Sequence, residues 1–263
     1  MTTVWITDEA TGVPGNTTSV IWAVIVATGV VIISLAREVA GDYAWWVAGV
    51  ALVVVVIAIR SLVPRGTLLV KPGLPATIFL RGAVAATFFS TEVYLPYQLT
   101  VVYDLPVWLA GVILTVGAIS WAIGSAIQGR IDERMSHDAV MRAGAGILLV
   151  GIAVQFVSAF FVLSPFVAAS GWLLAGLGMG LVFPRISTLV LAYSTERDQG
   201  FNSAAMSNMD TTGSATSIAF AGLIFFAVGG GSFAAVMAFT TVLAVIALAV
   251  SFRVRTPSAE DAG

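Results

Sequence analysis

The feature that most constrains the fold is the stretch at residues 92–142, in which apolar runs alternate with short polar turns. It begins with Glu92-Val-Tyr-Leu-Pro-Tyr-Gln98, continues with a long apolar run from Pro106, and ends in a tight loop. The loop and its edges carry Arg130, Asp132, Glu133, Arg134, His137, Asp138 and Arg142. Apolar segments of about 20 residues cross the hydrocarbon of a bilayer, and charges gather where the chain re-emerges. The stretch therefore predicts a membrane span, a turn, a second span and a charged loop.

The composition supports the same conclusion for the whole chain. Hydrophobic residues make up 59% and charged residues 10%, whereas about a quarter of a soluble domain is charged. Too few polar residues remain to cover a soluble core, so we expect an all-α integral membrane protein. A net charge of −2 gives no basic face for nucleic acid. The sequence has no cysteine and no HExxH or GxSxG motif, so we expect neither an enzyme, a metal site nor a cofactor.

The apolar runs predict about eight transmembrane helices. They lie at about residues 18–36, 43–60, 76–98, 106–128, 140–163, 167–192, 207–228 and 232–252. The runs are continuously apolar, whereas the strands of a membrane barrel alternate over about ten residues. Helices also satisfy every backbone polar group internally, as lipid requires.

Prolines and glycines divide the chain into units, and the cations orient it. The predicted units are an N-terminal tail at 1–17, a two-helix membrane unit at 18–63, a Pro/Gly-rich linker at 64–75, a six-helix unit at 76–253 and a C-terminal tail at 254–263. Eight spans put nine cations on the side of both termini: Arg60, Arg65, Lys71, Arg130, Arg134, Arg142, Arg197, Arg253 and Arg255. The opposite side carries only Arg37. The positive-inside rule therefore places both tails and the linker in the cytoplasm.

Glycines are frequent inside three of the predicted spans, where small residues let helix backbones approach closely. They are Gly111, Gly117 and Gly124, then Gly144, Gly146 and Gly151, then Gly171, Gly176, Gly178 and Gly180. We expect these positions to lie in helix–helix interfaces.

The order of local motifs resembles a known transporter family. The motifs are Tyr94-Leu-Pro96-Tyr-Gln98, then Leu109-Ala-Gly111, then the loop Gly129-Arg-Ile-Asp-Glu-Arg134, then a glycine-rich span ending in Phe183-Pro184. From about residue 18 onward, the chain resembles the C-terminal part of a major facilitator superfamily transporter of the fourteen-span drug:proton antiporter branch. The resemblance implies two extra helices followed by a six-helix half-bundle of that fold.

The resemblance also implies a partner, because such transporters hold substrate between two halves at the bilayer midplane. We expect the chain to be a truncated piece of a longer transporter. The alternatives are a half-transporter that pairs with itself or with a separate N-terminal half, and a decayed gene product.

Ionisable residues inside spans are functional candidates, because each costs roughly 2.5–3.5 kcal/mol to insert. Glu92 is a proton-coupling candidate if it faces a cavity; the alternative is a structural carboxylate near the outer headgroups. Asp210 is the second proton-coupling candidate. Its similar depth to Arg185 on consecutive antiparallel helices predicts an ion pair, either switching or static. Arg81 is expected to reach lipid phosphate at the cytoplasmic end of its span, or to lie on the substrate path.

Further polar residues complete the candidate set. Arg130, Asp132 and Arg134 form a gating loop if they clamp helix ends; otherwise the loop is solvated and only fixes topology. Gln98 and Gln155 are candidates for the substrate path, or for bonds between helices. Phe88, Phe89, Phe156, Trp172, Met179 and Phe183 suit a broad apolar pocket, although such residues more often pack or face lipid.

These observations lead to two functional expectations. The first is proton-coupled export of small amphipathic compounds across the cell membrane by alternating access, as in multidrug efflux. The second is a truncated or vestigial membrane module that does not transport without a partner half.

Overall fold

The computed structural model describes residues 17–131, 135–227 and 231–255, and every regular element within these ranges is helical. The helices are α1 (Thr17–Ala40), the short 3₁₀ helix η1 (Gly41–Tyr43), α2 (Ala44–Ile59), α3 (Leu74–Val101), α4 (Val107–Ile131), α5 (His137–Phe161), α6 (Pro165–Ala192), α7 (Gln199–Ala227) and α8 (Phe233–Ser251). The predicted all-helical class is therefore confirmed. The predicted tails lie almost wholly outside the described residues.

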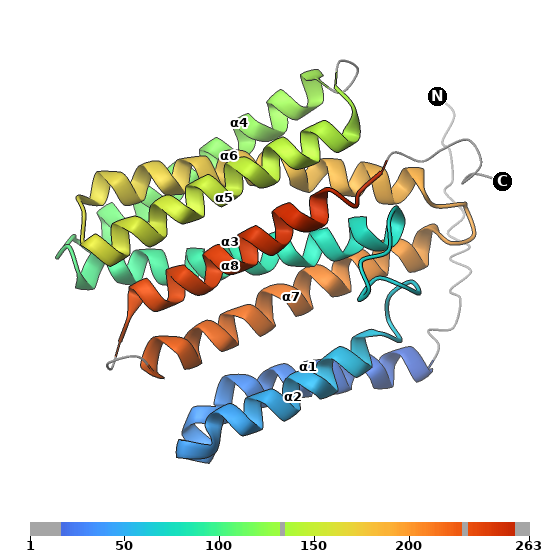
Figure 1. Cartoon of the computed structure of the whole chain (residues 1–263), viewed down its shortest axis with the longest axis horizontal. Coiled ribbons are helices and arrows are strands. Elements are labelled where there is room, and N and C mark those ends of the chain that lie inside the picture. Colours follow the sequence, from blue (N-terminus) through green and yellow to red (C-terminus); the bar gives the residue numbers. More distant parts are fainter. Residues whose placement is uncertain (1–16, 132–134, 228–230, 256–263) are drawn as a thin grey trace, which may run out of the picture.

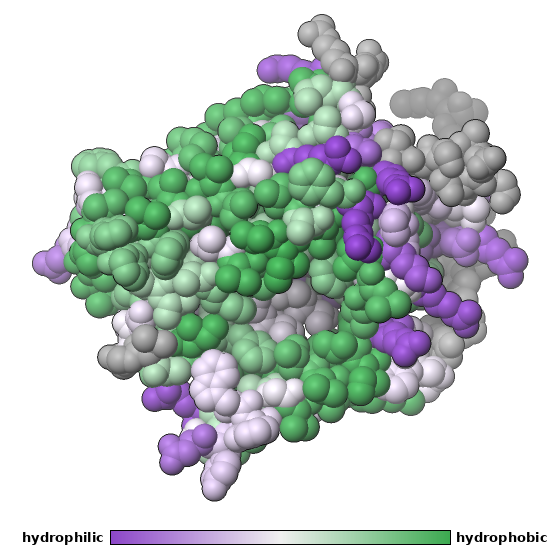
Figure 2. All heavy atoms as spheres, in the orientation of Figure 1, coloured by the Kyte–Doolittle hydropathy of each residue, from purple (hydrophilic) through white to green (hydrophobic). Residues whose placement is uncertain are grey.

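Six segments of the described chain are long and apolar enough to cross a membrane. They are Thr17–Ile59, Leu74–Val101, Val107–Ile131, His137–Phe161, Pro165–Ala192 and Phe233–Ser251. The first contains both α1 and α2, which turn back on one another at η1 and lie side by side (Figure 1). Figure 2 shows hydrophobic residues over the middle of the molecule and hydrophilic residues gathered toward its ends. Several apolar helices of this length define a multi-pass membrane protein.

Serine side chains mark the starts of three helices. The Oγ atoms of Ser136, Ser164 and Ser232 accept hydrogen bonds from the backbone N–H of Ala139, Phe166 and Ala235, respectively. Each bond satisfies a donor that the first turn of a helix cannot pair internally. At α6 the cap is followed directly by Pro165, which has no N–H and is favoured at that position.

Helix α3 runs through the centre of the six-helix unit and contacts α4, α5, α6, α7 and α8. Around it, α6 packs between α4 and α5, while α5 also packs on α8. The α1–α2 hairpin lies at one side of this unit and contacts it mainly through α7 (Figure 1). In the same view α1 begins and α8 ends at one end of the bundle.

Close backbone approach explains most of the glycines inside the bundle. A methyl group at Gly178 of α6 would lie 2.5 Å from the backbone nitrogen of Leu148 in α5, and one at Gly124 would lie 2.5 Å from the carbonyl oxygen of Leu177. Such contacts are impossible for a real side chain without movement of the helices. The expectation is wrong at Gly111 and Gly146, where no neighbouring atom lies within 4 Å.

Two predicted boundaries differ from the structure. Helix α7 begins at Gln199, eight residues before the predicted start of its apolar run, because hydropathy reports where a helix enters lipid and not where its hydrogen bonds begin. The linker ends at Leu74, where α3 starts. Its turns are held by internal bonds, with the N–H groups of Leu69 and Lys71 both donating to the carbonyl of Gly66.

Candidate functional site: a buried arginine–aspartate pair

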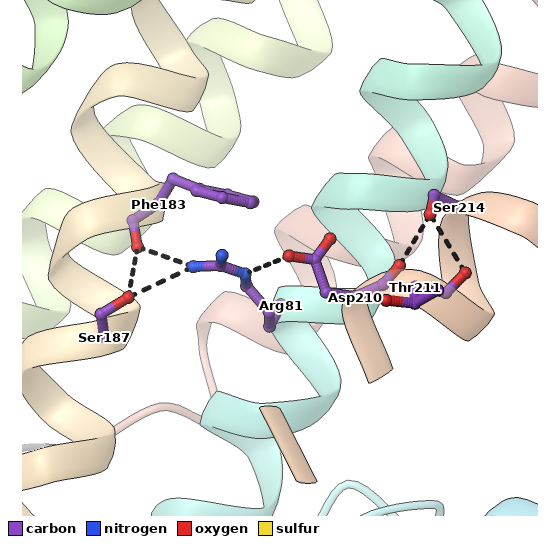
Figure 3. A network of polar contacts seen from close by, with 6 residues as sticks. All are labelled: Arg81, Phe183, Ser187, Asp210, Thr211 and Ser214. Atoms are coloured by element: carbon purple, nitrogen blue, oxygen red, sulfur yellow. Dashed lines mark hydrogen bonds and ion pairs between the residues drawn. The ribbon is translucent and has the colours of Figure 1, made fainter. Parts of the chain in front are cut away.

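The most polar contact inside the bundle joins Arg81 of α3 to Asp210 of α7. The Arg81 Nε donates to Asp210 Oδ2 over 3.0 Å, and the two side chains are only 12% and 22% exposed. The Nη1 of Arg81 donates to the carbonyl oxygen of Phe183 at 3.2 Å and to the Oγ of Ser187 at 3.3 Å, both on α6. Figure 3 shows the guanidinium between the two helices, with Asp210 on one side and α6 on the other. One cation therefore connects three helices.

An aromatic ring completes the surroundings of Arg81. The guanidinium carbon lies 3.2 Å from the ring centroid of Phe183, a distance at which the face of the ring attracts a cation. The ring of Phe183 also packs edge-on against Trp121, which in turn meets Phe88. Phe88 is stacked on Trp172 with centroids 4.4 Å apart. The arginine thus sits at the edge of an aromatic cluster that spans α3, α4 and α6.

The structure corrects the partner predicted for Asp210, which is Arg81 and not Arg185. Helices α3 and α7 approach so closely at Gly82 and Gly213 that a methyl group at Gly213 would lie 2.6 Å from the carbonyl oxygen of Gly82. This contact brings the neighbouring Arg81 and Asp210 face to face. The expectation that Arg81 reaches lipid phosphate is also wrong, because its side chain points into the bundle (Figure 3).

Arg185 instead turns toward α5. Its side chain is fully buried, and its Nη1 lies 3.1 Å from Nδ1 of His137. His137, expected within the charged loop, is the first residue of α5. The contact joins the C-terminal half of α6 to the N-terminus of α5.

Glu92 occupies a separate place on α3. Eleven residues separate it from Arg81, which is about 16 Å along a helix. Its side chain is half-buried, and no hydrogen bond or ion pair among residues 17–131, 135–227 and 231–255 involves it. The structure therefore does not bring the two proton-coupling candidates together.

The two glutamines are both fully buried but differ in their contacts. The Nε2 of Gln155 donates to the carbonyl oxygen of Ala168 at 2.7 Å. Gln155 therefore links α5 to α6, which is the second of the two alternatives expected for it, a bond between helices. Both polar atoms of the Gln98 amide lack a partner in the described part of the chain. An unpaired buried amide is unfavourable by about 1–3 kcal/mol.

Only part of the predicted gating loop lies within the described residues. Arg130 is exposed in the last turn of α4, whereas Asp132 and Arg134 lie outside the described residues. Among the residues that are described, no three His, Asp or Glu side chains come together in a way that could hold a metal ion.

Sequence reasoning missed a second polar link between α3 and α7. The Oγ of Ser90 donates to the Oγ of Ser217 at 2.7 Å, and Ser217 also donates to the carbonyl oxygen of Ala86. Asp210, Ser214 and Ser217 recur at spacings of four and three, which place them on one face of α7. That spacing was a readable signal, because polar residues at helical period in a membrane segment indicate an interior face.

The comparisons with known proteins do not assign the chain to a family. No protein-family model matches the chain, and no curated protein matches it.

Proposed function

We propose that the chain is one half of a secondary active transporter that exports small amphipathic compounds in exchange for protons. In this proposal the protein is a C-terminal half of the major facilitator kind, from the fourteen-span drug:proton antiporter branch. It resides in the cell membrane with both termini in the cytoplasm. The observation that carries the proposal is the Arg81–Asp210 pair between α3 and α7. Charges placed within membrane helices are unfavourable, and they mark ion or proton pathways.

The chemistry of the pair suits coupling between a proton and a helix movement. When Asp210 is ionised, it holds Arg81 at 3.0 Å and so joins α7 to α3. When Asp210 takes a proton, that attraction is lost. Arg81 still keeps the carbonyl of Phe183, the hydroxyl of Ser187 and the Phe183 ring as partners on α6. Protonation therefore removes the charged link between α7 and α3 at this level, while Arg81 still joins α3 to α6, and a proton can bias the position of α7 in this way.

The exposed side of α7 supports a polar path beside this pair. Ser207 and Thr211 are exposed, and Asp210 and Ser214 lie next to them on the same side of the helix. Helix α7 is also absent from the segments apolar enough to cross a membrane. A polar helix face is unfavourable against lipid and requires water or another protein surface. We propose that a second half, either a separate N-terminal half or another copy of this chain, covers this face and encloses the substrate.

The alternative is a truncated or vestigial module that keeps the half-bundle without transporting. The unpaired buried amide of Gln98 favours it, because a complete assembly is expected to satisfy such a group. The two proposals differ in whether the purified protein couples substrate to proton movement.

A proton-flux assay in reconstituted vesicles tests the proposal. The protein is placed in vesicles with an acidic lumen and a trapped pH dye, and a lipophilic aromatic cation is added as the probe. We expect the probe to drive proton release with the unaltered chain. Asp210→Asn abolishes the release, while Asp138→Asn preserves it, since Asp138 pairs with Arg142 at the start of α5, away from the Arg81–Asp210 pair. If flux is unchanged in both Glu92→Gln and Asp210→Asn, neither carboxylate carries the proton. If the unaltered chain alone gives no flux, a transporter made of two copies of this chain is excluded, and the chain either requires a separate N-terminal half or does not transport.

A further inference from the structure

Two hollows meet where the α1–α2 hairpin joins the six-helix unit. The first has a volume of about 440 Å³ and lies between α2, α3, α7 and α8, with walls that include Phe79, Phe220 and Leu243. The second has a volume of about 830 Å³ and lies around the end of α2 and the turns that follow it. Val56 and Leu68 line both hollows, so the two adjoin one another. The face in Figure 2 is hollowed at this seam.

The two hollows, which together form a groove along the seam, differ in chemistry. The inner part is apolar apart from a few hydroxyl groups on α7, such as Thr216 and Ser217. The mouth is lined by Arg60, Arg65 and Lys71, and all three are exposed. None of these three side chains has an ion pair among the residues that the structure describes. The sequence from 43 to 91 contains no Asp or Glu, so the cations at the mouth have no acidic neighbour along this part of the chain.

The dimensions of the inner part match one leaflet of a bilayer. Along α7 it extends from Met209 to Phe220, which is about 16 Å at the helical rise. Half of the hydrocarbon core is about 15 Å thick. An occupant with its polar end at the mouth would therefore extend its apolar part about as far as the bilayer centre.

We propose that this groove binds one anionic phospholipid, with its phosphate between Arg60, Arg65 and Lys71 and one acyl chain between the hairpin and the bundle. Clustered Lys and Arg at the edge of a bilayer attract anionic headgroups, and an apolar groove open to lipid suits a hydrocarbon chain. The bound lipid fills the seam and holds the hairpin against α7. This inference uses residues outside the Arg81–Asp210 site, so it is independent of the proposed transport function.

Lipid titration monitored by native mass spectrometry tests both ends of the site. The purified full chain is titrated with phosphatidylglycerol as the anionic probe and with phosphatidylcholine as the zwitterionic one. The headgroup variant is Arg60→Gln with Arg65→Gln. Its matched control is Arg130→Gln with Arg197→Gln, which removes the same charge from exposed positions outside the groove. The acyl-chain variant is Val56→Trp, and its control is Val53→Trp, an exposed α2 position that lines neither hollow.

We expect one phosphatidylglycerol to bind the unaltered chain more tightly than phosphatidylcholine does. The headgroup variant raises the apparent Kd for phosphatidylglycerol by about 30-fold, since each cation near the surface contributes about fivefold. It weakens phosphatidylcholine binding much less, because the choline cation of that headgroup already offsets the charge of its phosphate. Val56→Trp weakens the binding of both lipids, and both controls behave like the unaltered chain. The proposal is overturned if the headgroup variant and its control bind phosphatidylglycerol equally, or if Val56→Trp binds lipid as well as Val53→Trp does.

Discussion

The α1–α2 hairpin and the α3–α6–α7 core differ in their content of ionisable residues. Between residues 17 and 36, and again between 44 and 59, the hairpin carries no ionisable side chain, and most of its residues are exposed. The core contains Arg81, Glu92, Arg185 and Asp210. Since ionisable residues inside membrane helices are unfavourable and usually functional, we expect the hairpin to serve mainly as a lipid-facing attachment and any proton chemistry to lie in the core.

Breaking the ion pair has the largest expected effect. Asp210→Asn or Arg81→Met alone leaves one buried charge without its partner, and we expect either to lower the free energy of unfolding by about 3–5 kcal/mol. The double variant Arg81→Met/Asp210→Leu recovers most of this loss, because apolar side chains replace both charges. Unfolding in mixed detergent micelles measures the difference.

A hairpin substitution is the control for this experiment. Arg37 is exposed at the end of α1, and its guanidinium carbon lies 5.1 Å from the ring centroid of Phe226. We expect Arg37→Met to change the unfolding free energy by less than about 1 kcal/mol. Equal losses for Arg37→Met and Arg81→Met would contradict the contrast between the two regions.

Glycine-to-alanine substitutions measure how closely the helices pack in the core and in the hairpin. Gly178→Ala forces a methyl group to within 2.5 Å of α5 backbone, so we expect a loss of about 1–3 kcal/mol in unfolding free energy. Gly49→Ala in the hairpin meets no atom within 4 Å and gains up to about 1 kcal/mol from helix propensity. Thermal unfolding followed by circular dichroism measures both, and a neutral Gly178→Ala would refute the close α5–α6 approach.

Replacing each of the two buried glutamines by leucine measures how much its amide contributes to the stability of the core. Because both polar atoms of Gln98 lack partners, Gln98→Leu is expected to raise the unfolding free energy by about 1–3 kcal/mol. Gln155→Leu loses the bond to Ala168 and is expected to lower it by about 1 kcal/mol. The same thermal measurement separates them. Destabilisation by Gln98→Leu would mean that this amide is satisfied in the working protein.

Cysteine labelling reports exposure to water with the least change in stability. The chain has no cysteine, so single substitutions can be labelled with a membrane-impermeant maleimide. We expect Thr211→Cys on α7 to react at least about tenfold faster than Val53→Cys on the hairpin, because only a thiol in water forms the reactive thiolate. Similar rates at the two positions would remove the argument for a polar path along α7.

Much of the fold could be predicted from the sequence because run length and hydropathy report directly on the bilayer. Seven of the eight predicted spans both begin and end within a few residues of the observed helices, whereas α7 begins eight residues before its predicted start because its first turns are polar. The predicted glycine contacts at Gly124 and Gly178 are confirmed for the same reason: only small residues permit such close helices.

The partner of Asp210 could not be predicted in the same way. Sequence position gives the depth of a residue along a helix, since each residue adds about 1.5 Å. It does not give the rotation of that helix about its axis. Depth alone led to the prediction of Arg185 as the partner of Asp210, whereas the contact of Gly82 with Gly213 places Arg81 opposite it. The packing of helices that are distant in the sequence determines which arginine faces Asp210, and no short sequence pattern around these residues predicts that packing.

The central claim is that Asp210 exchanges its bond to Arg81 for a proton, and infrared difference spectroscopy of the reconstituted chain tests it most directly. Spectra are recorded before and after addition of the aromatic cation in the unaltered protein, in Asp210→Asn and in Glu92→Gln. The account predicts a carboxylic-acid carbonyl band that changes in the unaltered protein and in Glu92→Gln, and is absent in Asp210→Asn. A band that persists in Asp210→Asn and disappears in Glu92→Gln would contradict it and would assign the proton to Glu92.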